Sequence, residues 1–146
     1  MKRTYWQIIL FLTAALLGAG CTSFEHEWAQ AKRTPASPGD LTGAWRGTWQ
    51  NTNNAHGDVL RAVVTQVNNT NYTARFHAVW GSHRGSFRTK LVGQRTGAEF
   101  VFSGRKHILG FLITTRGQAN ATNFFSTYES RFDTGTFTLQ RPAAGE

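Results

Sequence analysis

The stretch from Leu41 to Arg141 contains no proline, and short segments within it alternate apolar with polar residues. Successive side chains of a β-strand point to opposite faces, so this two-residue period predicts half-buried strands. Asn, Asp and Gly fill the breaks between the segments, and these residues tolerate the left-handed backbone of tight turns. We therefore expect eight strands, at Gly43–Gln50, Val59–Val67, Tyr72–Trp80, Ser86–Val92, Glu99–Ser103, Ile108–Arg116, Asn123–Arg131 and Thr136–Arg141.

Eight sequential strands with short connections predict an all-β domain over residues 41–142. An open, flat meander would leave two strand edges exposed, and closing the sheet into a barrel removes them. A barrel of about eight strands either fills with side chains or holds one small ligand. We expect an antiparallel up-and-down barrel, with a two-sheet sandwich as the alternative architecture.

The alternation assigns an inward, apolar face and an outward face that carries residues such as Arg75, His77 and Lys90. Small residues among the inward aromatics have two interpretations. They pack opposite bulky rings in a filled barrel, or they leave room for an apolar or amphipathic ligand. For the second case, the residues expected to line the ligand are Trp49, Ala62, Tyr72, Phe76, Phe100, Phe102, Phe111 and Tyr128.

The N-terminus has the three-part layout of a secretory signal peptide. A basic start, Met1-Lys2-Arg3, precedes the apolar run Ile8–Leu17, and small residues follow up to Gly20. The apolar run is shorter than the roughly 18–20 residues that span a bilayer. We expect residues 1–20 to be an export signal rather than a permanent membrane span.

The segment Leu16–Cys21 resembles the lipobox of bacterial lipoproteins, although Leu17 lies four residues before the cysteine and the family prefers three. The resemblance implies that Cys21 is acylated, becomes the first residue of the mature chain and anchors it to a membrane. Thr22, in place of Asp, implies the outer membrane, at its periplasmic face. We expect residues 21–40 to be a flexible tether, with a short helical turn around Phe24–Ala31 as the alternative.

The domain starts with two Gly-x-Trp units, at Gly43–Trp45 and Gly47–Trp49, and its last expected strand ends at Arg141. These ends resemble the calycin pattern of lipocalins and fatty-acid-binding proteins. The resemblance implies that Trp45 plugs one end of the barrel and that Arg141 packs over its ring. It covers the architecture only, because the domain has no room for a C-terminal helix or a helical lid. The same start also resembles a group of bacterial envelope lipoproteins with no associated activity, which share an ending of the form Asp133-x-Gly135-x-Phe137.

Residues for catalysis or metal binding are sparse. The single cysteine excludes a disulfide framework, and none of the five histidines forms a close metal-ligand pair with another. The nucleophile elbow and the P-loop are both missing from the sequence. We expect no catalytic residue, no metal and no cofactor, and a hydrolase is only a distant alternative.

The formal net charge is +8, and residues 41–142 hold twelve Lys and Arg against four Asp and Glu. An exported protein is a poor partner for nucleic acid, so this basic face either binds anionic lipid or another envelope polyanion, or serves solubility alone. The sequence predicts a non-catalytic, membrane-anchored lipoprotein whose barrel binds a small apolar or amphipathic ligand. The alternative is a structural or interaction protein of the envelope with a filled barrel.

Overall fold

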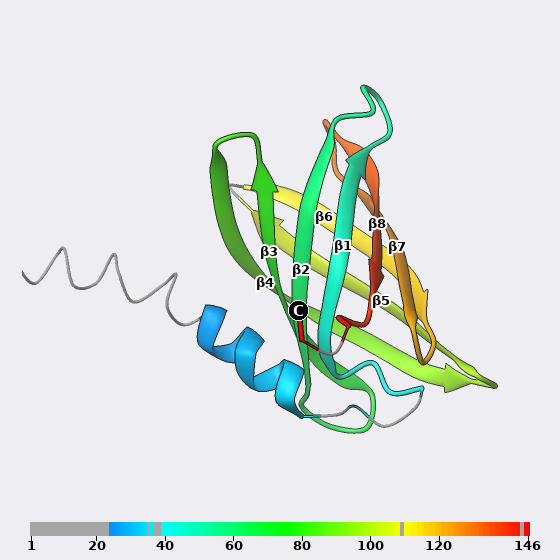
Figure 1. Cartoon of the computed structure of the whole chain (residues 1–146). Coiled ribbons are helices and arrows are strands. Elements are labelled where there is room, and N and C mark those ends of the chain that lie inside the picture. Colours follow the sequence, from blue (N-terminus) through cyan, green and yellow to red (C-terminus); the bar gives the residue numbers. More distant parts are fainter. Residues whose placement is uncertain (1–23, 35, 37–38, 109, 144) are drawn as a thin grey trace, which may run out of the picture.

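The computed structural model describes residues 24–34, 36, 39–108, 110–143 and 145–146. They form a closed antiparallel barrel in which each strand pairs with the next and β1 pairs with β8 (Figure 1). The up-and-down barrel is thus confirmed, and the sandwich is wrong. Cys21 and the expected signal peptide lie outside the described residues. The strands are β1 (Gly43–Asn51), β2 (Gly57–Gln66), β3 (Asn71–Trp80), β4 (His83–Thr96), β5 (Glu99–Ile108), β6 (Phe111–Ala119), β7 (Asn123–Glu129) and β8 (Thr134–Gln140).

The turn expected between the strands Glu99–Ser103 and Ile108–Arg116 lies at the wrong position. A break at Gly104-Arg105 is absent, because Gly104 lies inside β5 and pairs with Leu91 and Thr115 on the neighbouring strands. A Cβ on this glycine would lie 2.8 Å from Leu91 Cδ2, so the glycine lets that side chain pack closely. The chain reverses a few residues later, beside Gly110, whose φ of +82° is the left-handed conformation that glycine favours.

Trp45 and Trp49 lie near opposite ends of β1, and the two ends of the barrel are named after them below. The Trp45 end carries Gly43, Arg141 and the connections β2–β3, β4–β5 and β6–β7. The Trp49 end carries the connections β1–β2, β3–β4, β5–β6 and β7–β8.

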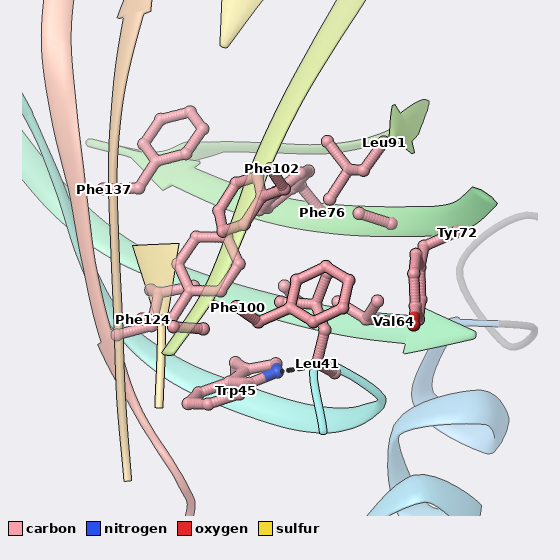
Figure 2. Packing of buried hydrophobic residues seen from close by; sticks show 14 of the residues in the cluster. Leu41, Trp45, Val64, Tyr72, Phe76, Leu91, Phe100, Phe102, Phe124 and Phe137 are labelled. Atoms are coloured by element: carbon pink, nitrogen blue, oxygen red, sulfur yellow. Dashed lines mark hydrogen bonds between the residues drawn. The ribbon is translucent and has the colours of Figure 1, made fainter. Parts of the chain in front are cut away.

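Aromatic rings pack against one another across the interior (Figure 2). Phe124 lies at the centre of this cluster, with its ring centroid 4.8 Å from that of Phe102 and 5.6 Å from that of Trp45. Phe76 extends the contacts to Phe137 at 5.3 Å. The inward face expected from the alternation is therefore the core of the domain.

A helical segment, residues 24–33, packs on the outside of the barrel, so the flexible tether expected here is wrong for this stretch (Figure 1). Phe24, Trp28 and Ala31 share one helix face and cover Ala44 of β1 and Val63 of β2. Burial of this apolar stripe stabilises a helix that would be marginal alone. Within the described part of the chain, no helix has the length and apolar character needed to cross a membrane.

Candidate ligand-binding site

The Trp45 end of the barrel is plugged by side chains. The Trp45 ring is fully buried, and its Nε1 donates a hydrogen bond to the Leu41 carbonyl at 2.9 Å. The guanidinium carbon of Arg141 lies 3.6 Å from the ring centroid. Arg141 also donates to the carbonyls of Asp40 and Thr42, each at 2.7 Å. Burial lowers the pKa of Arg141 to about 10, so the side chain stays charged at neutral pH.

A layer of aromatic rings crosses the barrel between its two ends. The ring of Phe76 stacks on that of Phe87 at a centroid distance of 5.2 Å and meets that of Phe137 at 5.3 Å. Tyr128 lies 5.1 Å from Phe137 on the next strand. Because these rings come from β3, β4, β7 and β8, they connect opposite walls and limit how deeply a ligand can enter from the Trp49 end.

At the Trp49 end, apolar side chains of the inward face remain partly exposed. Four such residues pack against the core and are only partly buried: Trp49, Ala78, Phe87 and Ile113. The indole of Trp49 is held in place, because its Nε1 donates to the Val79 carbonyl of β3 at 2.8 Å. Solvent therefore reaches apolar inner surface at this end, in contrast to the plugged end.

Polar groups gather beside this apolar surface. The carboxylate of Asp133 accepts hydrogen bonds from the Tyr128 hydroxyl, at 3.2 Å, and from the Asn51 side-chain amide. Burial and the neighbouring Asp133 charge raise the pKa of Tyr128 to about 12, which keeps the phenol protonated. Asp58 accepts from the backbone amide of Gly81 at 3.2 Å. The arrangement can hydrogen-bond the polar end of a small molecule.

The residues expected to line a ligand are divided between the two ends. Trp49 and Tyr128 lie at the Trp49 end, while Ala62, Phe76 and Phe102 are buried in the core. Tyr72 and Phe100 contact each other at 5.0 Å towards the Trp45 end, away from the partly exposed surface.

Phe111, also expected to line a ligand, lies at the rim of the Trp49 end rather than in the buried core. Its side chain is 44% exposed and packs edge-on against Phe132 of the β7–β8 connection, at 4.9 Å. Phe111 is the first residue of β6 and pairs there with Ile108 of β5, whereas the pairing of β6 with β7 begins at Thr114.

Phe87 and Ile113 are not among the residues expected to line a ligand, and the sequence did not indicate Asn51 and Asp133 as polar partners. The separation of Asn51 and Asp133 along the chain hides this pairing, which arises only where β1 meets β8. Ser126 is another polar residue of the inward face. Its hydroxyl is fully buried and forms no hydrogen bond within the described structure.

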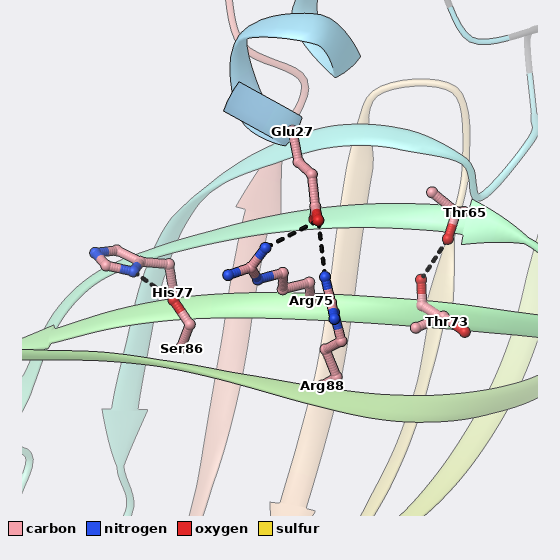
Figure 3. A network of polar contacts seen from close by, with 7 residues as sticks. All are labelled: Glu27, Thr65, Thr73, Arg75, His77, Ser86 and Arg88. Atoms are coloured by element: carbon pink, nitrogen blue, oxygen red, sulfur yellow. Dashed lines mark hydrogen bonds and ion pairs between the residues drawn. The ribbon is translucent and has the colours of Figure 1, made fainter. Parts of the chain in front are cut away.

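The opposite, outer face of the barrel holds the helical segment through a polar network (Figure 3). Glu27 Oε1 lies 2.9 Å from Arg75 Nη1 and 2.7 Å from Arg88 Nη2. Glu25 pairs with Arg61, and this hydrogen bond lowers the pKa of the Glu25 carboxyl. Each of the three arginines thus pairs with one of the two helix carboxylates, which leaves one positive charge in excess.

His77 lies in the same interface. Its ring stacks on Phe24 at a centroid distance of 4.7 Å, and its Nδ1 lies 2.8 Å from the Ser86 hydroxyl. Burial, assisted by the charge of Arg61, lowers the pKa of His77. Arg75 and His77 do lie on the outer face, but the helix buries both of them. No three His, Cys, Asp or Glu side chains converge as a metal site among the residues that the structure places.

No protein-family model matches this chain, and no curated protein matches it by sequence. Among solved structures, a crystal structure of a mutant of the fluorescent protein UnaG aligns with a TM-score of 0.41 and 11% sequence identity. The alignment covers 71% of this chain and 97% of that one.

Proposed function

We propose that this protein is an exported, lipid-anchored and non-catalytic binding protein, whose barrel takes the apolar part of a small amphipathic ligand at the Trp49 end. The difference between the two barrel ends carries the proposal. The Trp45 end is plugged, whereas Trp49, Phe87 and Ile113 leave apolar inner surface partly exposed at the other end. An apolar lining with a few convergent polar groups is typical of small-molecule sites.

The geometry restricts the kind of ligand. The aromatic layer around Phe76 stops deep entry, so the ligand inserts a short apolar portion. Its polar end would lie near Tyr128 and Asp133, where a hydrogen-bond donor could share the Asp133 carboxylate. A neutral or cationic donor suits that carboxylate better than an anion does.

A titration tests this site. We would use the full chain carrying Cys21→Ser, with N-phenyl-1-naphthylamine as a neutral apolar fluorescent probe. Ile113→Trp fills the inward surface and should weaken probe binding about tenfold. The matched control is Leu112→Trp, because Leu112 is the adjacent residue and is 42% exposed. Equal affinity of the two variants, or no binding by the parent chain, would overturn the ligand proposal.

The proposed anchor is Cys21, with the outer membrane as the destination and its periplasmic face as the location. Each buried CH₂ contributes roughly 0.8 kcal/mol, so two acyl chains hold a protein on a membrane durably. Cys21→Ser should abolish labelling by radioactive palmitate and release the protein from the membrane fraction, whereas Ser23→Ala should change neither. Retained label in Cys21→Ser would contradict acylation at this residue.

One observation favours a second function. Aromatic side chains occupy much of the interior, with Phe102, Phe124 and Trp45 in mutual contact. A barrel filled in this way suits a structural or interaction protein of the envelope, and failure of the probe titration would support that alternative.

A further inference from the structure

The outer face of β4, β5 and β6 carries a basic hollow that the proposed function does not use. Its volume is 420 Å³, and Lys90, Arg105 and Arg116 supply positive charge around it. The hydroxyl-bearing residues Ser103 and Thr114 also line it. All three basic side chains are exposed, and all three point away from the barrel interior.

Within the described part of the chain, the basic residues of this hollow are not paired with carboxylates, unlike Arg46 and the arginines that contact the helix. Arg61, Arg75 and Arg88 pair with carboxylates of the helix, and Arg46 pairs with Glu146. Among the residues that the structure describes, no ion pair involves the basic side chains of the hollow.

Two of these basic residues face each other directly. Lys90 of β4 and Arg105 of β5 are register partners in an antiparallel pair. Like charges at directly opposed positions destabilise a sheet. An anion held between them would remove this repulsion, and a guanidinium and an ammonium together form a strong site for phosphate oxygens.

The hollow continues into an apolar region. A second hollow of 440 Å³ shares Val92, Ser103 and Arg116 with the first and extends to Val101. Val92 is 54% and Val101 46% exposed, which is high for valines on a strand. The combined surface therefore has a basic half and an apolar half, as an anionic amphiphile requires.

We propose that this groove binds an anionic phospholipid. The phosphate lies between Lys90, Arg105 and Arg116, and the first carbons of an acyl chain lie over Val92 and Val101. This site is on the outside of the barrel and is independent of ligand binding at the Trp49 end. It gives the basic face a defined partner, where composition alone left solubility as an equal explanation.

The test compares three soluble probes by NMR titration of the full chain carrying Cys21→Ser. The probes are dihexanoyl phosphatidylglycerol, the zwitterionic dihexanoyl phosphatidylcholine and inorganic phosphate. We expect the first to bind at least about tenfold more tightly than either of the others, because it alone satisfies both halves of the groove. Equal affinity for inorganic phosphate would reduce the site to an ion site and overturn the lipid assignment. A single-stranded oligonucleotide that bound more tightly than the anionic lipid would overturn it as well.

Variants distinguish specific binding in the groove from a diffuse attraction to the basic surface. Arg105→Gln and Lys90→Gln should each weaken phosphatidylglycerol binding about tenfold, and Val92→Ser should weaken it without affecting phosphate. The matched controls are Arg84→Gln, an exposed arginine outside both hollows, and Val67→Ser, which is 66% exposed in the β2–β3 connection. Lys90→Gln should also raise the thermal midpoint, since it removes the like-charge pair. Loss of binding in Arg84→Gln equal to that in Arg105→Gln would show a diffuse attraction and overturn the proposal.

Discussion

The guanidinium of Arg141 lies over the indole ring of Trp45 at 3.6 Å, and this contact joins the first strand to the residue that follows the last strand. The same guanidinium donates to two backbone carbonyls in the segment that leads into β1. Arg141 thus combines a cation–π contact with backbone hydrogen bonds at the point where the barrel closes.

Trp45→Ala should reduce the free energy of unfolding by about 3–5 kcal/mol, because it empties a fully buried site. In a double-mutant cycle with Arg141→Ala, we expect a coupling energy of about 1–2 kcal/mol, measured by urea denaturation.

The control for this cycle is a second cation–π pair on the surface. Arg131 lies 5.5 Å from the ring centroid of Phe132, which is largely exposed. The coupling of Arg131→Ala with Phe132→Ala should stay below about 0.5 kcal/mol. Additive effects in the Trp45–Arg141 cycle would mean that the contact does not contribute to closure.

Gly47→Ala should disrupt the seam between β1 and β8. A Cβ at this position would lie 2.0 Å from the Thr138 carbonyl oxygen, a backbone atom that cannot move without separating the strands. We expect a loss of about 3 kcal/mol in the free energy of unfolding, measured by thermal denaturation. The comparison is Gly97→Ala, where the space is open and only the positive φ of +64° opposes the substitution. That variant should lose about 1 kcal/mol, and an equal loss in both would contradict the steric argument.

Glu27 should hold the helix more strongly than Glu25 does. Its carboxylate lies between Arg75, which is buried, and Arg88, whereas Glu25 contacts the partly exposed Arg61. Glu27→Gln should weaken helix docking by about 1–2 kcal/mol, and Glu25→Gln by less than about 1 kcal/mol. Hydrogen exchange of the amides in residues 24–33 measures both effects. The opposite order would show that the buried arginine does not depend on Glu27.

Acidification should release the helix in two stages. The pKa of His77 is lowered in the folded state, so its contribution to stability is complete above its ordinary pKa of 6.5 and is lost as the pH falls below that value. The pKa of Glu25 is also lowered, so its contribution is lost only below about 4.5. Exchange of the helix amides should therefore rise first below pH 6.5. His77→Gln should remove that first stage, and His107→Gln, at an exposed position, should leave it in place.

Strand number and the inward face were predictable because each strand is half-buried, and the two-residue period is visible in any such strand. The break at Gly104 was wrong because a glycine inside a strand and a glycine in a turn look alike in sequence. The helix was misassigned as a tether because its apolar stripe consists of only three residues, Phe24, Trp28 and Ala31. So short a stripe specifies a helix only when a matching surface is present, and here β1 and β2 supply it.

The location of the candidate site depended on the tertiary structure even more than the strands and the helix did. Trp49 and Tyr128 are inward residues at the Trp49 end, but the alternation gives no information on depth along the barrel. For that reason Tyr72 and Phe100 at the other end had the same sequence signature.

The amino-acid sequence alone predicted the number of strands and the apolar inward face, and the resemblance to calycins implied the contact between Trp45 and Arg141. These features follow from local periodicity and from motifs at the two ends of the domain. Only the tertiary structure decided which inward residues lie at the Trp49 end, which arginines pair with the helix carboxylates and which basic side chains remain opposed on β4 and β5. Those properties depend on register between strands, and register sets distances between residues that no local pattern relates.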